Sequence, residues 1–135
     1  NMRSTRIVTS FLTNNNKILI LKRSDKVKSM QGLWSGVSGL IENSELPLDR
    51  AKIEIFEEVG LQENDLTLLK EAESVTVSSP QYRNHQWEIY PFLFETKNGK
   101  IKLNWENSDF KWVERMELKE YQTVPNLEDI LLRLV

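Results

Sequence analysis

Three glutamates in one short segment, Glu54, Glu57 and Glu58, could together bind a metal ion. If the segment is helical, their side chains fall within an arc of roughly 100° along one edge of the helix. The like charges of Glu54 and Glu58, four residues apart, then cost the helix about 0.2 to 0.5 kcal/mol. A divalent cation would remove this cost, and Mg²⁺ binds carboxylate oxygens and bridges them to substrate phosphates. Because glutamate is also common on solvated helix faces, the interpretation as a metal site depends on the surrounding residues.

The helix that would present these carboxylates is predicted over residues 46–59. Apolar residues recur at helical spacing along one face of this segment: Leu48, Ala51, Ile55 and Val59. We expect Ser44 to cap its N-terminus and Gly60 its C-terminus. Residues 23–39 precede the helix and are typical of a long loop that enters a short strand, and loops of this length usually carry function.

Strand-like segments flank this loop and helix on both sides. An N-terminal hairpin is predicted from residues 5–12 and 17–21, and later strands at residues 66–69, 73–78, 87–95 and 110–113. We expect residues 87–95 to form a second hairpin with residues 101–103. An amphipathic helix at the C-terminal end is indicated by Leu127, Ile130, Leu131 and Leu134. This order predicts one domain over residues 1–135, an α/β sandwich whose mixed sheet is covered on two faces by helices.

The sequence around the glutamates resembles the Nudix box. The stretch GLIENSELPLDRAKIEIFEEVGL begins at Gly39 and places Glu45 six positions later and Glu54 nine positions after that. The box pattern is G, five residues, E, seven residues, then R-E-U-x-E-E-x-G-U, where U is a bulky aliphatic residue. Every specified position matches except one, because Ile53 stands where the family has arginine. Matches at fixed spacing over so long a span make this a specific signal.

The resemblance extends beyond the box. Arg23 and the Gly-Leu-Trp segment at residues 32–34 resemble the family's basic residue and the lead-in to its box. Residues 103–113 resemble the family's late loop, in which an acidic residue precedes a tryptophan. The similarity therefore spans most of the chain and implies the Nudix-type fold, an α/β/α sandwich with a mixed central sheet.

The resemblance also implies an activity, which is Mg²⁺-dependent hydrolysis of a diphosphate linkage in a nucleoside diphosphate derivative. Mn²⁺ is the alternative cation. The implied metal ligands are Glu54, Glu57, Glu58 and the backbone carbonyl of Gly39, with Glu57 as the essential ligand. Glu45 would orient the loop and the helix.

Catalytic and substrate-binding roles follow from the same resemblance. Family members take the general base from a box glutamate or from the late loop, where Glu106 and Asp109 are available, and we favour Glu106. The expected catalytic residues are therefore Glu57, Glu54 and Glu106. Arg23 and Trp34 are expected to bind the substrate.

The isoleucine at position 53 is the main departure from the family pattern. An arginine there would brace the acidic cluster, and isoleucine can neither donate hydrogen bonds nor offset charge. Arg50 precedes Glu54 by four residues, so its guanidinium could reach that carboxylate and act as the structural support instead. The departure leaves open a non-catalytic Nudix-like module that binds a nucleotide as a sensor. The four retained box glutamates favour the enzyme.

Composition limits the class of partner. With 18 basic and 20 acidic residues the formal net charge is -2, so the chain has no global positive field to attract a nucleic acid polymer or an anionic membrane. The sequence has no cysteine, which fits the cytoplasm, and no apolar run approaches the roughly 20 residues that span a bilayer. We expect a cytoplasmic protein with a small nucleotide-like diphosphate substrate, and leave open a homodimer.

Overall fold

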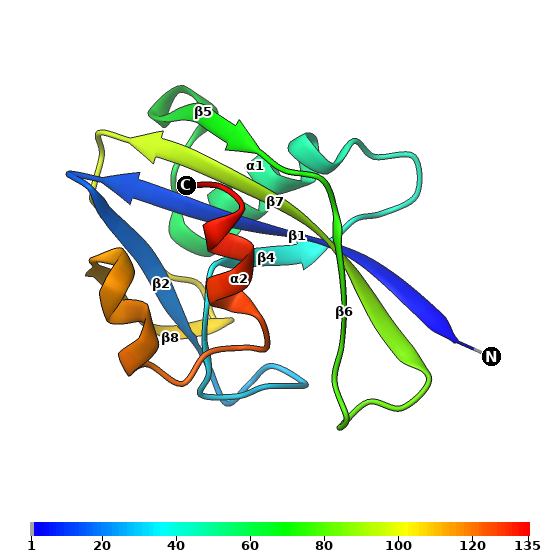
Figure 1. Ribbon diagram of the computed structural model, residues 1–135. Coiled ribbons are helices and arrows are strands. Elements are labelled where there is room, and N and C mark those ends of the chain that lie inside the picture. Colours follow the sequence, from blue (N-terminus) through cyan, green and yellow to red (C-terminus); the bar gives the residue numbers. More distant parts are fainter. Residues whose placement is uncertain (1) are drawn as a thin grey trace.

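A mixed β-sheet forms the centre of the computed structural model, which describes residues 2–135 (Figure 1). Asn1, the first residue of the expected domain, lies outside the described residues. The eight strands are β1 (Arg3–Asn14), β2 (Lys17–Arg23), β3 (Trp34–Ser35), β4 (Val37–Leu40), β5 (Leu66–Glu71), β6 (Val75–Ser78), β7 (His85–Thr96) and β8 (Asn107–Val113). The α-helices are α1 (Pro47–Val59) and α2 (Leu127–Leu132), and the 3₁₀ turns are η1 (Glu63–Asp65) and η2 (Arg115–Glu120).

The long strands β1 and β7 form the spine of the sheet. They run parallel, in register from the pair Arg3 and His85 to the pair Thr13 and Glu95. The main path is β3-β2-β1-β7-β5, and β4, β6 and β8 pair with β1, β7 and β2 respectively. The pairs other than β1 with β7 are antiparallel, so the sheet is mixed, as predicted.

The two α-helices cover opposite faces of this sheet (Figure 1). Side chains alternate between faces along a strand, so Val8 and Leu12 of β1 join one core cluster while Phe11 joins the other. The first cluster contains Ala51, Ile55 and Val59 of α1, and the second contains Leu127, Ile130 and Leu131 of α2. This arrangement confirms the predicted α/β sandwich. Among residues 2–135, no helix has the length and apolar character needed to cross a bilayer.

The start of α1 differs from the prediction. Ser44 is not the N-cap: it has a φ of 70°, and the helix begins after Leu46 with Pro47 in its first turn. Proline is favoured there because its fixed φ suits a helix and its missing N–H would have no partner in the helix. The predicted end is confirmed, since Gly60 has a φ of 78° and its N–H donates to the carbonyl of Phe56 at 3.0 Å.

The predicted hairpin between residues 87–95 and 101–103 is also wrong. Glu95 of β7 already pairs with Thr13 of β1 on one edge and with Thr67 of β5 on the other, so β7 has no free edge for a third strand. Residues 101–103 form no strand and instead follow the end of α1, where the N–H of Lys102 donates to the carbonyl of Val59 at 2.9 Å.

Candidate active site

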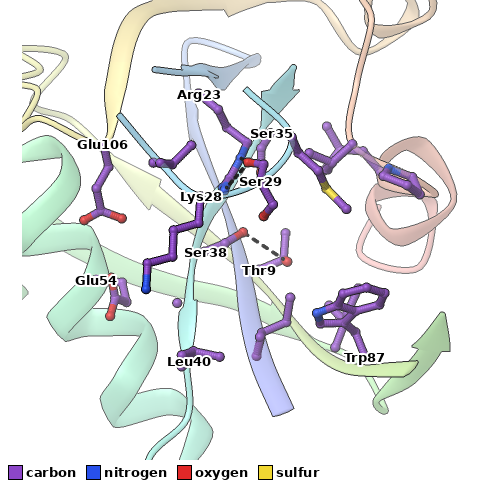
Figure 2. Close-up of a pocket in the computed structure, with 18 of the residues that line it drawn as sticks. Thr9, Arg23, Lys28, Ser29, Ser35, Ser38, Leu40, Glu54, Trp87 and Glu106 are labelled. Atoms are coloured by element: carbon purple, nitrogen blue, oxygen red, sulfur yellow. Dashed lines mark hydrogen bonds between the residues drawn. The ribbon is translucent and has the colours of Figure 1, made fainter. Parts of the chain in front are cut away.

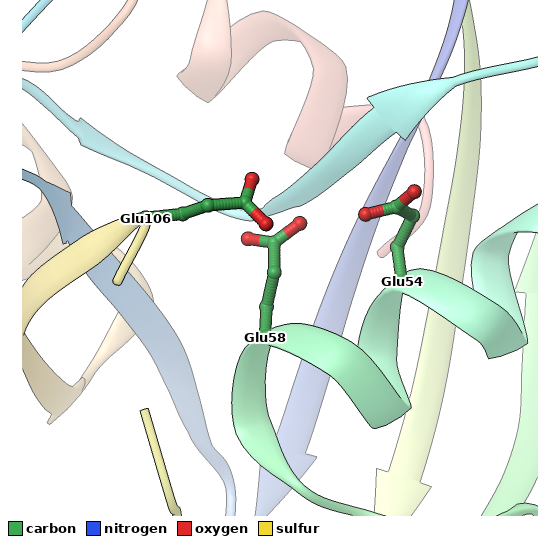
Figure 3. A group of neighbouring side chains, drawn as sticks. All are labelled: Glu54, Glu58 and Glu106. Carbon is green, nitrogen blue, oxygen red and sulfur yellow. The ribbon is translucent and has the colours of Figure 1, made fainter. Parts of the chain in front are cut away.

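Three carboxylates from distant parts of the sequence converge at one point. Glu54 and Glu58 come from successive turns of α1, and Glu106 comes from the loop that leads into β8 (Figure 3). Each offers an oxygen atom, and these atoms lie within 4.8 Å of one another. Ser24 fixes the loop from the other side, because its hydroxyl donates to the carbonyl of Trp105 at 2.8 Å and its N–H donates to that of Glu106 at 2.9 Å. We call Glu54, Glu58 and Glu106 the carboxylate group.

Burial makes this carboxylate group electrostatically costly. Glu54 and Glu58 are 9% and 4% exposed, and burial is the largest cause that raises the pKa of both above the ordinary value. The negative charge of Glu106 raises both pKa values further, whereas the amide of Asn107, which donates to Oε1 of Glu58 at 3.0 Å, opposes the rise for Glu58. Within the described part of the chain, Oε2 of Glu58 is buried without a hydrogen-bond partner. A buried oxygen of this kind, facing two further carboxylates, fits a cation ligand.

Arg50 supplies positive charge to one edge of the carboxylate group. Its Nε and Nη2 donate to Oε1 and Oε2 of Glu45 at 2.9 and 2.7 Å, and its Nη1 donates to Oε2 of Glu54 at 3.0 Å. The guanidinium beside Glu45 lowers the pKa of that carboxyl, and the same hydrogen bonds raise the pKa of Arg50. Arg50 therefore ties Glu45, just before the helix, to a member of the carboxylate group. Ile53, one turn later, is 41% exposed.

Gly39 allows α1 to approach the sheet closely. It lies in β4 opposite Val8 of β1, and a Cβ atom added to it would come within 2.5 Å of Oε2 of Glu54. A side chain here would displace Glu54, so the position requires glycine. The backbone of β4 at Gly39 therefore lies directly against Glu54 of the carboxylate group, and we call this part of the site its corner.

A cavity of about 650 Å³ opens in front of this corner (Figure 2). Glu54, Glu57 and Glu106 line its acidic end, and Lys28 reaches towards the same end from the loop after β2. Arg23 also lines the cavity, and its Nε and Nη2 donate to the carbonyl of Ser29 at 3.1 and 2.9 Å, which holds that loop in place. The cavity therefore offers carboxylates for a cation and a lysine for a phosphate.

The structure separates the predicted site residues into those that meet and those that do not. Glu57 lies on the cavity wall but is exposed and outside the carboxylate group. Asp109 is exposed in β8, where its carboxylate accepts the N–H of Phe110 at 2.8 Å, and only Glu106 of the two late-loop candidates joins the group. Trp34 is 8% exposed in the core, edge-on to Tyr121 at 5.3 Å, and does not line the cavity. Its position gives it a packing role.

Two asparagines that support the site were not identified from the sequence. Asn107 donates to Glu58, as described above, and Asn104 donates from Nδ2 to Oε1 of Glu106 at 3.1 Å. The one feature of the sequence that could have indicated this role is that Asn104 and Asn107 flank Trp105 and Glu106. An amide near a carboxylate becomes meaningful only when the fold decides which carboxylate it meets.

A family model described as NUDIX domain matches residues 3–134. The C. elegans Ap4A hydrolase in a binary complex aligns with a TM-score of 0.78 and 15% identity, over 96% of this chain and 93% of that chain. The MutT protein from Methanosarcina mazei Go1 aligns with a TM-score of 0.77 and 19% identity, over 98% and 94%. The NUDIX domain of Shewanella oneidensis NrtR, complexed with ADP ribose, aligns with a TM-score of 0.76 and 14% identity, over 98% and 87%. No curated protein matches the sequence significantly. At these identities the structural matches show a shared fold.

We predict that Glu58→Gln raises the thermal stability of the metal-free protein at pH 8. The pKa of Glu58 in the folded state lies above its ordinary value of 4.5, so the folded state is destabilised as pH rises from that value through the raised pKa. Glutamine keeps an acceptor for Asn107 and carries no charge. We expect a rise in Tm of about 4 °C or more in EDTA, corresponding to about 1 kcal/mol, that shrinks towards pH 4.5. Equal melting curves at pH 8 would contradict the burial argument.

Arg50→Ala should weaken Mn²⁺ binding about 10- to 100-fold, the usual effect of losing a side chain that orients a ligand. The expected cause is that Glu54 and Glu45 both lose the hydrogen bonds that the Arg50 guanidinium donates to their carboxylates. Calorimetric titration with Mn²⁺ measures the effect. Lys52→Ala is the matched control, because this cation on the same helix pairs with the exposed Glu63 at 2.8 Å and should leave the affinity within about twofold. Similar affinities for the two variants would make Arg50 an ordinary surface residue.

Proposed function

This chain belongs to the NUDIX domain family, and we propose that it hydrolyses the diphosphate linkage of a nucleoside diphosphate derivative with Mg²⁺ as cofactor. Its family assignment and fold make it a hydrolase that acts on diphosphate bonds. The observation that carries the proposal is the carboxylate group at one end of a cavity, with the unpartnered Oε2 of Glu58 inside it. Mn²⁺ is the substitute cation that we expect to support turnover.

The residues of this corner fit a hard divalent cation. Glu54 and Glu58 would hold it with the carbonyl of Gly39, and Glu57 would hold it from the exposed side of the cavity. Such cations activate water and offset the negative charge of phosphate oxygens. The burial that raises the pKa of Glu54 and Glu58 also supports the proposal, because a nearby positive charge would restore their ionised forms.

Glu106 is the residue that we assign as general base. It lies in the carboxylate group and also lines the cavity, where one of its oxygens could accept a proton from the attacking water. The hydrogen bond from Asn104 to Oε1 orients the carboxylate and leaves Oε2 available. Lys28 would bind a phosphate oxygen, and Arg23 would hold the loop that carries Lys28.

A nucleotide-like substrate is supported by the cavity, whose volume suits a small molecule, and by the ligands named for similar proteins. One of these proteins hydrolyses Ap4A and another was solved with ADP ribose. We also propose a cytoplasmic location, which the absence of cysteine fits, and no partnership with a nucleic acid polymer or a membrane, in line with the charge balance. A homodimer stays a prediction.

Release of a nucleotide product, such as a nucleoside monophosphate, should be detectable by chromatography from at least one member of a panel of nucleotide sugars, dinucleoside polyphosphates and nucleoside triphosphates. We expect turnover with Mg²⁺, none in EDTA, and a loss of about 100-fold or more in Glu57→Gln, because it removes a proposed ligand. Glu95→Gln, an exposed glutamate of β7, is the matched control and should behave as the wild type. Binding of panel members without turnover would favour the nucleotide sensor. A normal Mg²⁺ titration in Glu57→Gln would remove that residue from the ligand set.

Glu106→Gln should lower kcat by about 10² to 10⁴, the range expected for loss of a general base. The substitution keeps the acceptor for Asn104, so the loop should retain its conformation. Asp109→Asn is the matched control, because Asp109 was the alternative base in the same segment and is exposed outside the carboxylate group. Steady-state kinetics on the best substrate of the panel measure both variants. An unchanged kcat in Glu106→Gln, or a larger loss in Asp109→Asn, would contradict the assignment.

A further inference from the structure

An aromatic cluster forms the end of the cavity that lies away from the carboxylate group. Trp87 of β7 lines this end, and Figure 2 shows it on the opposite side of β4 from Glu54 and Glu106. Tyr82 packs edge-on against the indole, with ring centroids 5.5 Å apart, and His85 packs against it at 4.6 Å. Because two rings support it, the indole is held in position before any ligand arrives.

His85 is itself held in place. Its Nε2 is hydrogen-bonded to the hydroxyl of Thr5 at 2.6 Å, across the parallel pairing of β1 with β7. Tyr82 lies in the turn between β6 and β7, so the cluster joins that turn to the spine of the sheet. Trp87 itself lies in β7, where its backbone pairs with Thr5 of β1 and Val77 of β6.

The rest of this end of the cavity is apolar. Ile7 and Ile89 line it from the two spine strands, and Leu127 and Ile130 line it from α2. Ile89, Leu127 and Ile130 are at most 5% exposed, which leaves a shallow apolar floor beside the indole. Such a surface favours a flat, poorly hydrated group over a charged one.

The register of the sheet sets the distance between the two ends. Trp87 pairs with Thr5 of β1, and Gly39 pairs with Val8, three residues further along the same strand. At ~3.3 Å per residue the two positions are about 10 Å apart along the strand. Thr5 and Val8 are an odd number of residues apart, so Trp87 and Gly39 belong to opposite faces of the sheet, and the cavity that both residues line connects them past β4. A ligand with its phosphates at the carboxylate group would follow this cavity to bring its base to Trp87.

The side chains that read base edges are missing from this end. Selection between bases through hydrogen bonds needs amide, carboxylate or guanidinium groups aimed at the base edge. Among the described residues that line the cavity there is no Asn, Gln, Asp or His, and the labelled carboxylates lie on the far side of β4. The guanidinium groups of Arg23 and Arg50 also line the cavity, but they are bonded to Ser29 and to Glu45 and Glu54 respectively. Ser78 and Ser79 line the cavity beside β7, and the hydroxyl of Ser79 already accepts the N–H of Gln81. His85 and Tyr82 pack against the indole but do not line the cavity, and Nε2 of His85 is bonded to Thr5.

We infer that Trp87 determines substrate selectivity by stacking on the base of a nucleoside diphosphate derivative, and that the site selects for an aromatic base without distinguishing one purine from another. The inference rests on the proposed function, because it takes the carboxylate end as the phosphate site. Stacking tolerates every base, and an apolar pocket discriminates similar groups far less than a hydrogen-bonding one.

Binding of α,β-methylene diphosphates of adenosine, guanosine, cytidine and uridine to the wild-type protein with Mg²⁺ tests this inference. These analogues resist hydrolysis, and methylenediphosphonate supplies the same anion without a base. We expect adenosine and guanosine analogues to bind within about fivefold of each other, and both to bind about 10- to 100-fold more tightly than methylenediphosphonate. A preference of more than about 100-fold for one purine would overturn the inference, because only base-edge hydrogen bonds give such a ratio.

Two variants separate stacking from a structural role. Trp87→Ala should weaken binding of the adenosine analogue about 10- to 100-fold and leave methylenediphosphonate within about twofold, and Trp87→Phe should lie between. Trp105→Ala is the matched comparison, since this 58% exposed tryptophan lines the cavity beside Glu106. Equal losses for the nucleotide and the base-free anion in Trp87→Ala, or a base-dependent loss in Trp105→Ala alone, would overturn the assignment.

The outcome is separable from that of the proposed function. If binding depends on the base through Trp87 but no panel member is hydrolysed, the proposed hydrolysis is contradicted and the role of Trp87 is not. If hydrolysis is equally fast with and without a base on the diphosphate, and binding is also independent of the base, the role of Trp87 is contradicted and the proposed hydrolysis is not.

Discussion

The burial of two carboxylates under the cavity is the constraint on which the rest of the site depends. Glu54 and Glu58 are almost fully covered, and taking charged groups out of water is costly unless they are paired. Arg50 and Asn107 each satisfy one of their oxygens, and Oε2 of Glu58 is left without a partner in the described chain. The helix is held in this costly arrangement by its apolar face, which packs on the sheet. The stability of the core therefore sustains a cluster of buried carboxylates whose charge is unfavourable unless it is neutralised.

The parallel pairing of β1 and β7 gives this arrangement its geometry. β1 carries Val8 opposite Gly39 of β4, and so fixes where α1 and its glutamates meet the sheet. β7 carries Trp87 in register with the same strand, and so fixes where the aromatic end of the cavity lies. Because the carboxylate end and the aromatic end of the cavity are both positioned by pairing with β1, their separation along that strand is set by backbone hydrogen bonds. A substrate of matching length then needs little rearrangement of the protein, which lowers the entropic cost of binding.

Arg50 illustrates how position in space can substitute for position in sequence. The family pattern has its arginine next to Glu54, whereas this chain has Ile53 there and an arginine one turn earlier. A long flexible side chain one turn away on the same helix can reach the same carboxylate, and Nη1 of Arg50 does so at 3.0 Å. Its Nε and Nη2 donate to the carboxylate of Glu45. Glu54 therefore has an arginine partner although position 53 is isoleucine.

Features that depend on local periodicity and fixed spacing could be predicted from the amino-acid sequence. The helix that the structure has at Pro47–Val59, its end at Gly60, the first hairpin and the mixed sheet between helices all follow from patterns within short windows. Contacts between distant residues became visible in the folded chain alone. Glu106 joins Glu54 and Glu58 while Asp109 does not, and Asn107 donates to Glu58. Trp87 lines the cavity, whereas Trp34 lies in the core. The tertiary structure also decided that residues 101–103 form no strand, because both edges of β7 were already occupied. These outcomes depend on sheet register and on competition between segments for one edge, and a single sequence read in short windows carries no direct record of either.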